Sequence, residues 1–75
     1  MSRLNNDAII VALVGDDGKL TSVRRYTARQ SDLAERFVLA AVHAGRQVRL
    51  TFLNLANGVD TLSDAQREAI ERAAR

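Results

Sequence analysis

The sequence contains no cysteine, no proline and no tryptophan, and it has one histidine in 75 residues. Without cysteine the chain forms no disulfide, and a single histidine leaves no plausible zinc site. A domain of this length lies near the lower size limit for unaided folding, and such domains gain stability from disulfides, metals or association. Since the first two are missing, we expect no metal or other cofactor and association with another chain, most simply as a homodimer.

Long apolar runs are also absent. The longest, Ala8 to Val14, is far too short to cross a bilayer. Asp7 directly precedes it and Gly15-Asp16-Asp17 follows, where a secretory signal would carry small residues. The apolar fraction of 47% is nevertheless that of a globular domain. We therefore expect a cytoplasmic protein without membrane contact.

Acidic residues are scarce in the middle of the chain. Residues 18 to 53 carry seven bases against two acids, although the net charge of the whole chain is only +2. Ten of the eleven basic residues are arginine. A basic centre of this kind suits either an acidic protein surface or the phosphates of a nucleic acid.

Two strands are predicted in the first third of the chain. Residues 8 to 14 are apolar on both faces of a strand, which favours the centre of a sheet. Residues 19 to 27 mix polar and apolar residues on both faces, as an edge strand does. Asp17-Gly18 between them indicates a hairpin turn. The spacing does not fit a phosphate-binding loop, and two adjacent aspartates lack the alternation of a calcium loop.

A helix, a third strand and a second helix are predicted to follow. Apolar residues recur at helical spacing from 31 to 44, and Gly45 is a suitable C-terminal cap. Residues 46 to 53 alternate as a half-buried strand does, and residues 54 to 60 read as a loop. Ser63 and Gln66 have the spacing of a capping box at the start of the last helix. The expected stripe of the first helix comprises Leu33, Phe37, Ala40, Ala41 and Ala44, widened by Val38 and Val42.

The predicted architecture is a small α+β domain of order ββαβα, spanning residues 1 to 75, with residues 1 to 7 as a flexible N-terminal extension. A crossover helix places the third strand parallel to the second, so the apolar first strand lies between them in the order 2-1-3. The first helix then covers one face of the sheet. The last helix offers only a thin, alanine-rich stripe to the other face, so we expect another polypeptide to help cover it.

The sequence shows no set of catalytic residues. A nucleophile, a base and an orienting group must converge within hydrogen-bonding distance, and no such set is evident. Ser31 is read as a helix start and His43 as a favourable charge at a helix C-terminus. Asp16 and Asp17 lie in an exposed turn. We therefore expect that the chain is not an enzyme.

The candidate partner-binding residues are Arg24, Arg25 and Tyr26 on the second strand, with Arg46 and Arg49 on the third. Arginine and tyrosine are enriched at the energetically important positions of protein interfaces. The hypothesis is a protein-binding regulator or inhibitor that occupies a partner's surface, of the type that phages and mobile elements encode. The alternative is a nucleic-acid-binding regulator that uses the same arginines.

Overall fold

The computed structural model describes residues 8–53 and 61–75 of the chain. In these ranges the order of elements is the predicted ββαβα, with one short 3-10 turn added between β2 and α1. The predicted N-terminal extension at 1–7 and the predicted loop at 54–60 lie outside the described residues. The elements are β1 (Ala8–Val14), β2 (Leu20–Thr27), η1 (Ala28–Gln30), α1 (Ser31–His43), β3 (Gln47–Leu53) and α2 (Asp64–Ala73).

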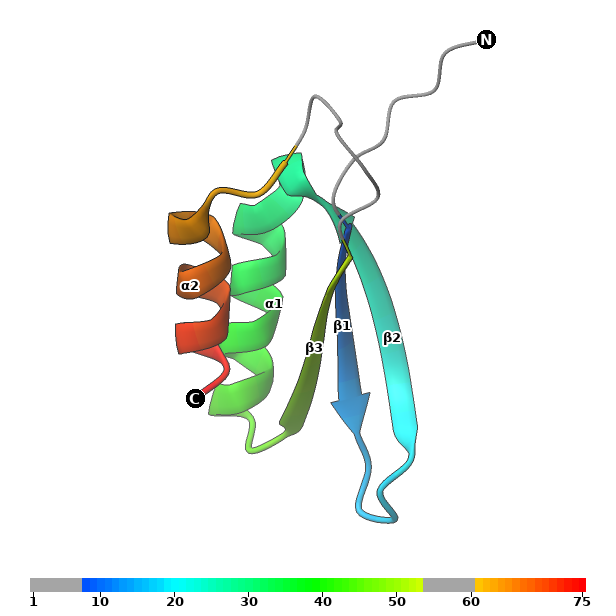
Figure 1. Cartoon of the computed structure of the whole chain (residues 1–75). Coiled ribbons are helices and arrows are strands. Elements are labelled where there is room, and N and C mark those ends of the chain that lie inside the picture. The colour runs from blue at the N-terminus through cyan, green and yellow to red at the C-terminus, as the bar shows by residue number, and fades with distance from the viewer. Residues whose placement is uncertain (1–7, 54–60) are drawn as a thin grey trace, which may run out of the picture.

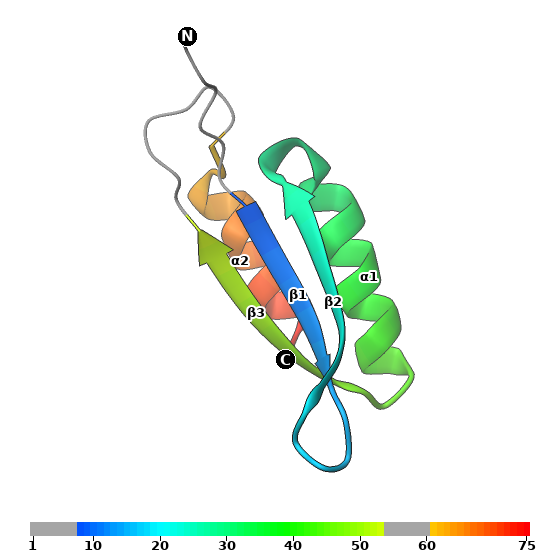
Figure 2. The same ribbon diagram turned by 90° about the vertical axis from the view of Figure 1, so that its right-hand side faces the viewer.

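The three strands form one sheet in the order β2-β1-β3, which confirms the predicted arrangement. The central strand β1 pairs antiparallel with both neighbours (Figure 2). The two edge strands are therefore parallel to each other, as a crossover through α1 requires. The pairing of β1 with β2 has one irregularity, between Leu13 and Val14 at the hairpin end.

The β1–β2 connection is a tight turn, as predicted. The Gly18 amide donates to the Gly15 carbonyl oxygen at 2.9 Å, and Gly18 has a left-handed φ of 83° that suits glycine. The Asp17 carboxylate accepts a hydrogen bond from the Lys19 amide at 3.0 Å. One of the two aspartates thus holds the turn together.

The C-terminus of α1 and the N-terminus of α2 have the predicted capping residues. Beyond α1, the amides of Gly45 and Arg46 donate to the carbonyls of Val42 and Ala41, which is a Schellman motif with Gly45 at φ 77°. At the start of α2, Ser63 and Gln66 form the predicted capping box.

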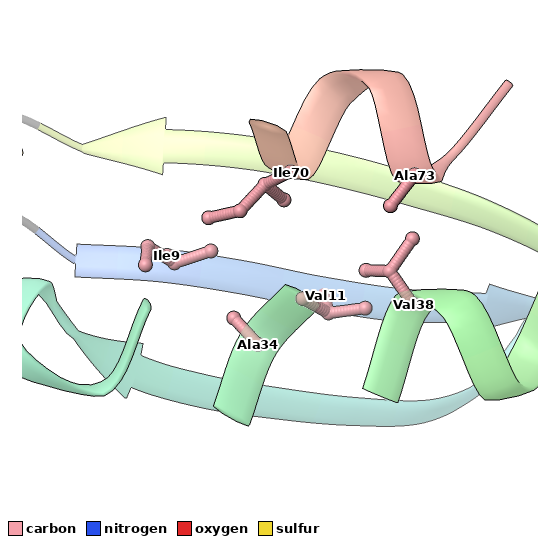
Figure 3. Packing of buried hydrophobic residues seen from close by; sticks show 6 residues of the cluster. All are labelled: Ile9, Val11, Ala34, Val38, Ile70 and Ala73. Carbon is pink, nitrogen blue, oxygen red and sulfur yellow. The ribbon is translucent and has the colours of Figure 1, made fainter. Parts of the chain in front are cut away.

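The hydrophobic core lies between the sheet and the helices (Figure 3). Its members come from β1, α1 and α2, and are Ile9, Val11, Ala34, Val38, Ile70 and Ala73. The expected stripe of the first helix is partly wrong, because Leu33 is 48% exposed and Ala40 and Ala44 are also exposed. The buried side of α1 is turned toward α2, which packs beside it.

Both helices cover the same face of the sheet. Figure 1 shows α1 and α2 on one side of the three strands, and in Figure 2 both lie behind the sheet. The Gln66 side-chain amide also donates to the Ser31 hydroxyl at 3.0 Å, which ties the starts of the two helices together. The expectation that α2 would partly cover the second face is therefore wrong, because Ile70 packs into the same core as Ile9 and Val38.

Candidate functional site: the open face of the sheet

The candidate site is the face of the sheet turned away from the helices, here called the open face. Ile9 and Val11 lie in the core, so the alternate residues of β1 and their cross-strand partners lie on the opposite side. No described residue outside the three strands lies over this face in Figure 2. Its members are Ala8, Ile10, Ala12 and Val14 of β1, Leu20, Val23, Arg25 and Thr27 of β2, and Gln47, Arg49, Thr51 and Leu53 of β3.

The apolar residues of the open face include three of the most exposed large side chains in the described structure. Val23 is 61% exposed, Leu20 48% and Leu53 41%. Ile10 and Val14 are half-buried, while the short side chains of Ala8 and Ala12 are buried among their neighbours. Covering what remains exposed of Leu20, Val23 and Leu53 would contribute on the order of 3 kcal/mol.

The charges of the open face are all positive. Arg25 lies opposite Ile10 on the β2 edge, and Arg49 lies opposite Ala12 on the β3 edge. Both side chains are exposed, and none of the described residues of the open face is acidic. A surface with an apolar centre and positive guanidinium groups favours binding to a partner surface that is apolar and carries carboxylates.

The structure does not bring the five predicted site residues together. Only Arg25 and Arg49 share the open face. Arg24 and Tyr26 point to the helix side of β2, where the Arg24 guanidinium lies 4.9 Å from the centre of the Phe37 ring. Adjacent residues of a strand must point to opposite faces, so Arg24 and Arg25 are separated by the sheet itself.

The other two predicted residues also have local contacts. The Tyr26 ring lies 6.5 Å from the Phe37 ring and packs against the core. Arg46 precedes β3, and its guanidinium donates to the Thr21 hydroxyl at 3.1 Å. Both arrangements hold neighbouring elements together: β2 with α1, and β2 with the start of β3.

The described aromatic rings all lie on the helix side of the sheet. Tyr26 and Phe52 are the two cross-strand partners of Ile9, and Phe37 lies on α1 beside Tyr26. Arg67 of α2 places its guanidinium 5.3 Å from the centre of the Phe52 ring. The open face therefore offers no ring on which a nucleic-acid base could stack.

The polar residues considered for catalysis do not converge. Ser31 is buried and bound to Gln66, whereas His43 is exposed at the end of α1. Asp16 and Asp17 are exposed in the hairpin turn. In the part of the chain that the structure describes, no three acidic, histidine or cysteine residues gather as metal ligands would.

A shallow hollow of about 210 Å³ lies between α1 and α2. Its volume is below the roughly 300–1,000 Å³ of typical small-molecule sites. It is lined by Glu35 and Leu39 of α1 and by Ala69, Arg72 and Ala73 of α2. The open face instead carries three of the exposed large apolar side chains, Leu20, Val23 and Leu53, so it is the stronger candidate.

Sequence reasoning missed Leu20 and Leu53 as site residues. Strand alternation could have found Leu53, because it lies on the same face as Arg49. It could not have found Leu20, which is placed opposite Val14 by the irregularity in the β1–β2 pairing. What the alternation does not tell is which face α2 covers; in the structure Ile70 packs in the same core as Val38 of α1.

No family model, curated protein or solved structure matches the chain. None of the described helices is long and apolar enough to cross a membrane. The functional argument therefore depends on the geometry and chemistry of the open face.

Proposed function

We propose that the chain is a non-catalytic binding protein that docks through the open face onto an apolar and acidic surface of a partner protein, and so acts as a regulator or inhibitor. One observation carries this proposal: both helices pack on one side of the sheet and leave the other side uncovered by the described elements. Val23 is 61% exposed there, beside Arg25.

Protein docking is better supported than nucleic-acid binding. Phosphate binding by several arginines needs them on one surface, whereas Arg24 and Arg46 are engaged elsewhere by Phe37 and Thr21. The apolar centre of the open face would gain little from a phosphate backbone. It matches the desolvated centre of a protein interface, with arginines at the rim.

A homodimer remains part of the proposal, and its geometry is constrained by charge. If two open faces stacked, two copies each of Arg25 and Arg49 would meet without an acidic partner on either face. Joining two β2 edge strands across a two-fold axis avoids this, and it leaves both open faces free for the partner. We therefore propose the β2 edge as the dimer contact.

The test of the docking function compares two double charge reversals with the wild-type chain. Arg25→Glu with Arg49→Glu alters the open face, and Arg36→Glu with Arg75→Glu makes the same charge change elsewhere. Each protein is immobilised and exposed to nuclease-treated extract of the cells that naturally express it. The wild type and the control should capture the same partner, and the open-face variant should lose it.

Two results would contradict the proposal. Equal capture by all three proteins would show that the open face is not the docking surface. Capture from untreated extract that is lost when the extract is treated with nuclease would support the nucleic-acid alternative instead. Urea denaturation of each variant checks that the charge reversals leave the fold intact.

A further inference from the structure

The apolar residues of the open face form a diagonal band. Along β1 the band includes Ala8, Ile10, Ala12 and Val14. It begins at Leu53, the β3 partner of Ala8, and reaches the opposite corner at Val23 and Leu20, the β2 partners of Ala12 and Val14. The band therefore crosses the sheet from the end of β3 to the start of β2.

The two arginines lie on opposite sides of this band. Arg25 is on the β2 side, beside Ile10, and Arg49 is on the β3 side, beside Ala12. The remaining corners are polar, with Thr27 at one and Gln47 at the other. The open face is thus an apolar stripe with one positive charge on each flank.

The size of the band suits one α-helix. Six residues of strand at about 3.3 Å each, crossed over two strand spacings of about 4.8 Å, give a diagonal of about 22 Å. A helix that covers this length has about 15 residues, or four turns.

We infer that the open face receives an amphipathic helix of the partner protein, about four turns long, with carboxylates on both flanks of its apolar stripe. This inference rests on the proposed docking function and specifies which structure and which charged groups the partner presents. A helix buries its apolar stripe against a sheet, so the complex has helices on both faces of the sheet. Arg25 and Arg49 each pair with a carboxylate at the rim.

A second copy of the chain is a poorer occupant of the band. Both described helices already pack against the core through Val38 and Ile70, and of the large apolar residues of α1 only Leu33 and Leu39 are exposed. A stacked second sheet would bring arginines without carboxylates. Charge complementarity therefore selects a helix from a different protein.

The test is a reciprocal charge exchange with two synthetic peptides. Both are capped 15-residue amphipathic helices with the same leucine and alanine stripe; one carries glutamate on both flanks and the other carries lysine. Each is titrated into the wild type, the Arg25→Glu and Arg49→Glu variant, and the Arg36→Glu and Arg75→Glu control. Methyl NMR shifts of Leu20, Val23 and Leu53 report binding at the open face.

The glutamate peptide should bind the wild type and the control about tenfold or more tightly than the open-face variant. The lysine peptide should show the reverse preference, which also proves that the variant is folded. The inference is overturned if neither peptide binds at millimolar concentration, if the flanking charge has no effect, or if only the methyls of Leu33 and Leu39 shift.

If the peptides fail while the capture difference holds, only the helical partner is wrong. If the capture difference fails, the docking function falls as well.

Discussion

Neighbouring arginines have different roles in this fold because a strand turns successive side chains to opposite faces. Arg24 lies over the Phe37 ring and joins β2 to α1, whereas Arg25 is exposed beside Ile10 on the open face. The first contributes to stability through a cation–π contact and the aliphatic part of its side chain. The second is available to a partner. A charge reversal at both positions would therefore mix a loss of stability with a loss of binding.

At the residue scale, the Arg24→Gln and Arg25→Gln variants should differ in stability. Loss of the Arg24 contact should lower the free energy of unfolding by about 0.5–1 kcal/mol. The Arg25 variant should stay within about 0.5 kcal/mol of the wild type, as surface changes usually do. Urea denaturation measures both values. Equal effects of the two substitutions would contradict the assigned orientation of Arg24.

At the scale of elements, the central strand β1 is apolar on both faces but is covered by the described helices on only one. Ile9 is completely buried beneath α1 and α2, while its neighbour Ile10 is half-buried in the open face. These two residues are identical and adjacent, and they sample the two faces of the same strand. They form a matched pair for measuring how well each face is packed.

Ile9→Val should lower the free energy of unfolding by about 0.5–1.5 kcal/mol, because it removes a methyl group from a packed core. Ile10→Val should have an effect below about 0.5 kcal/mol, since its surroundings are partly solvent. Chemical denaturation of the isolated chain gives both values. A cost at Ile10 equal to that at Ile9 would show that the open face is covered in the isolated protein.

Much of the fold was predictable from local patterns. The run from Ala8 to Val14 identified the central strand, and Asp17-Gly18 and Gly45 marked the turns that follow β1 and α1. The placement of α2 was not predictable, because its alanine-rich stripe fits either face of the sheet. In the structure the one large apolar residue of α2, Ile70, packs in the core beside Val38 of α1. The site was predicted only in part for the same reason: the face on which Arg25 and Arg49 are accessible depends on where α2 packs.

At the scale of the whole molecule, the described elements form two layers, with both helices on one side of the sheet and no described element over the other (Figure 1). A chain of 75 residues buries a small core, so association is a natural source of further stability. The β2 edge offers its backbone to a second copy, and the open face offers side chains to a partner; Val23 belongs to both. In the proposed dimer both open faces stay accessible, so each dimer would bind two partner molecules.

The dimer contact can be tested with single cysteines, because the chain has none of its own. In antiparallel β2–β2 pairing, a two-fold axis at Arg24 or Arg25 would set like charges directly opposite each other, which is unfavourable. Of the axes that avoid this, the one at Val23 also pairs the most exposed large apolar side chain of β2 with its own copy. Val23→Cys should therefore form an intermolecular disulfide, because paired Cα atoms lie within the range of about 4.4–6.8 Å that disulfides need.

Leu53→Cys, on the other edge strand, is the matched control and should stay reduced. Non-reducing gel electrophoresis reads out the bond, and sedimentation of the wild-type chain reports its mass in solution. A monomeric mass together with no disulfide at Val23→Cys would contradict the β2-edge dimer. The docking function of the open face would not be affected by that result.

The central claim, that the open face is the docking surface, is tested most directly by site-specific photo-crosslinking in the cells that naturally express the protein. A photoreactive amino acid replaces Ile10 at the centre of the open face or, in a separate variant, Leu39 on the helix layer, which is 39% exposed. Irradiation of the Ile10 variant should give a covalent adduct with one other protein, and irradiation of the Leu39 variant should give none. Adducts from Leu39 with none from Ile10 would show that the protein binds through its helices and would contradict this account.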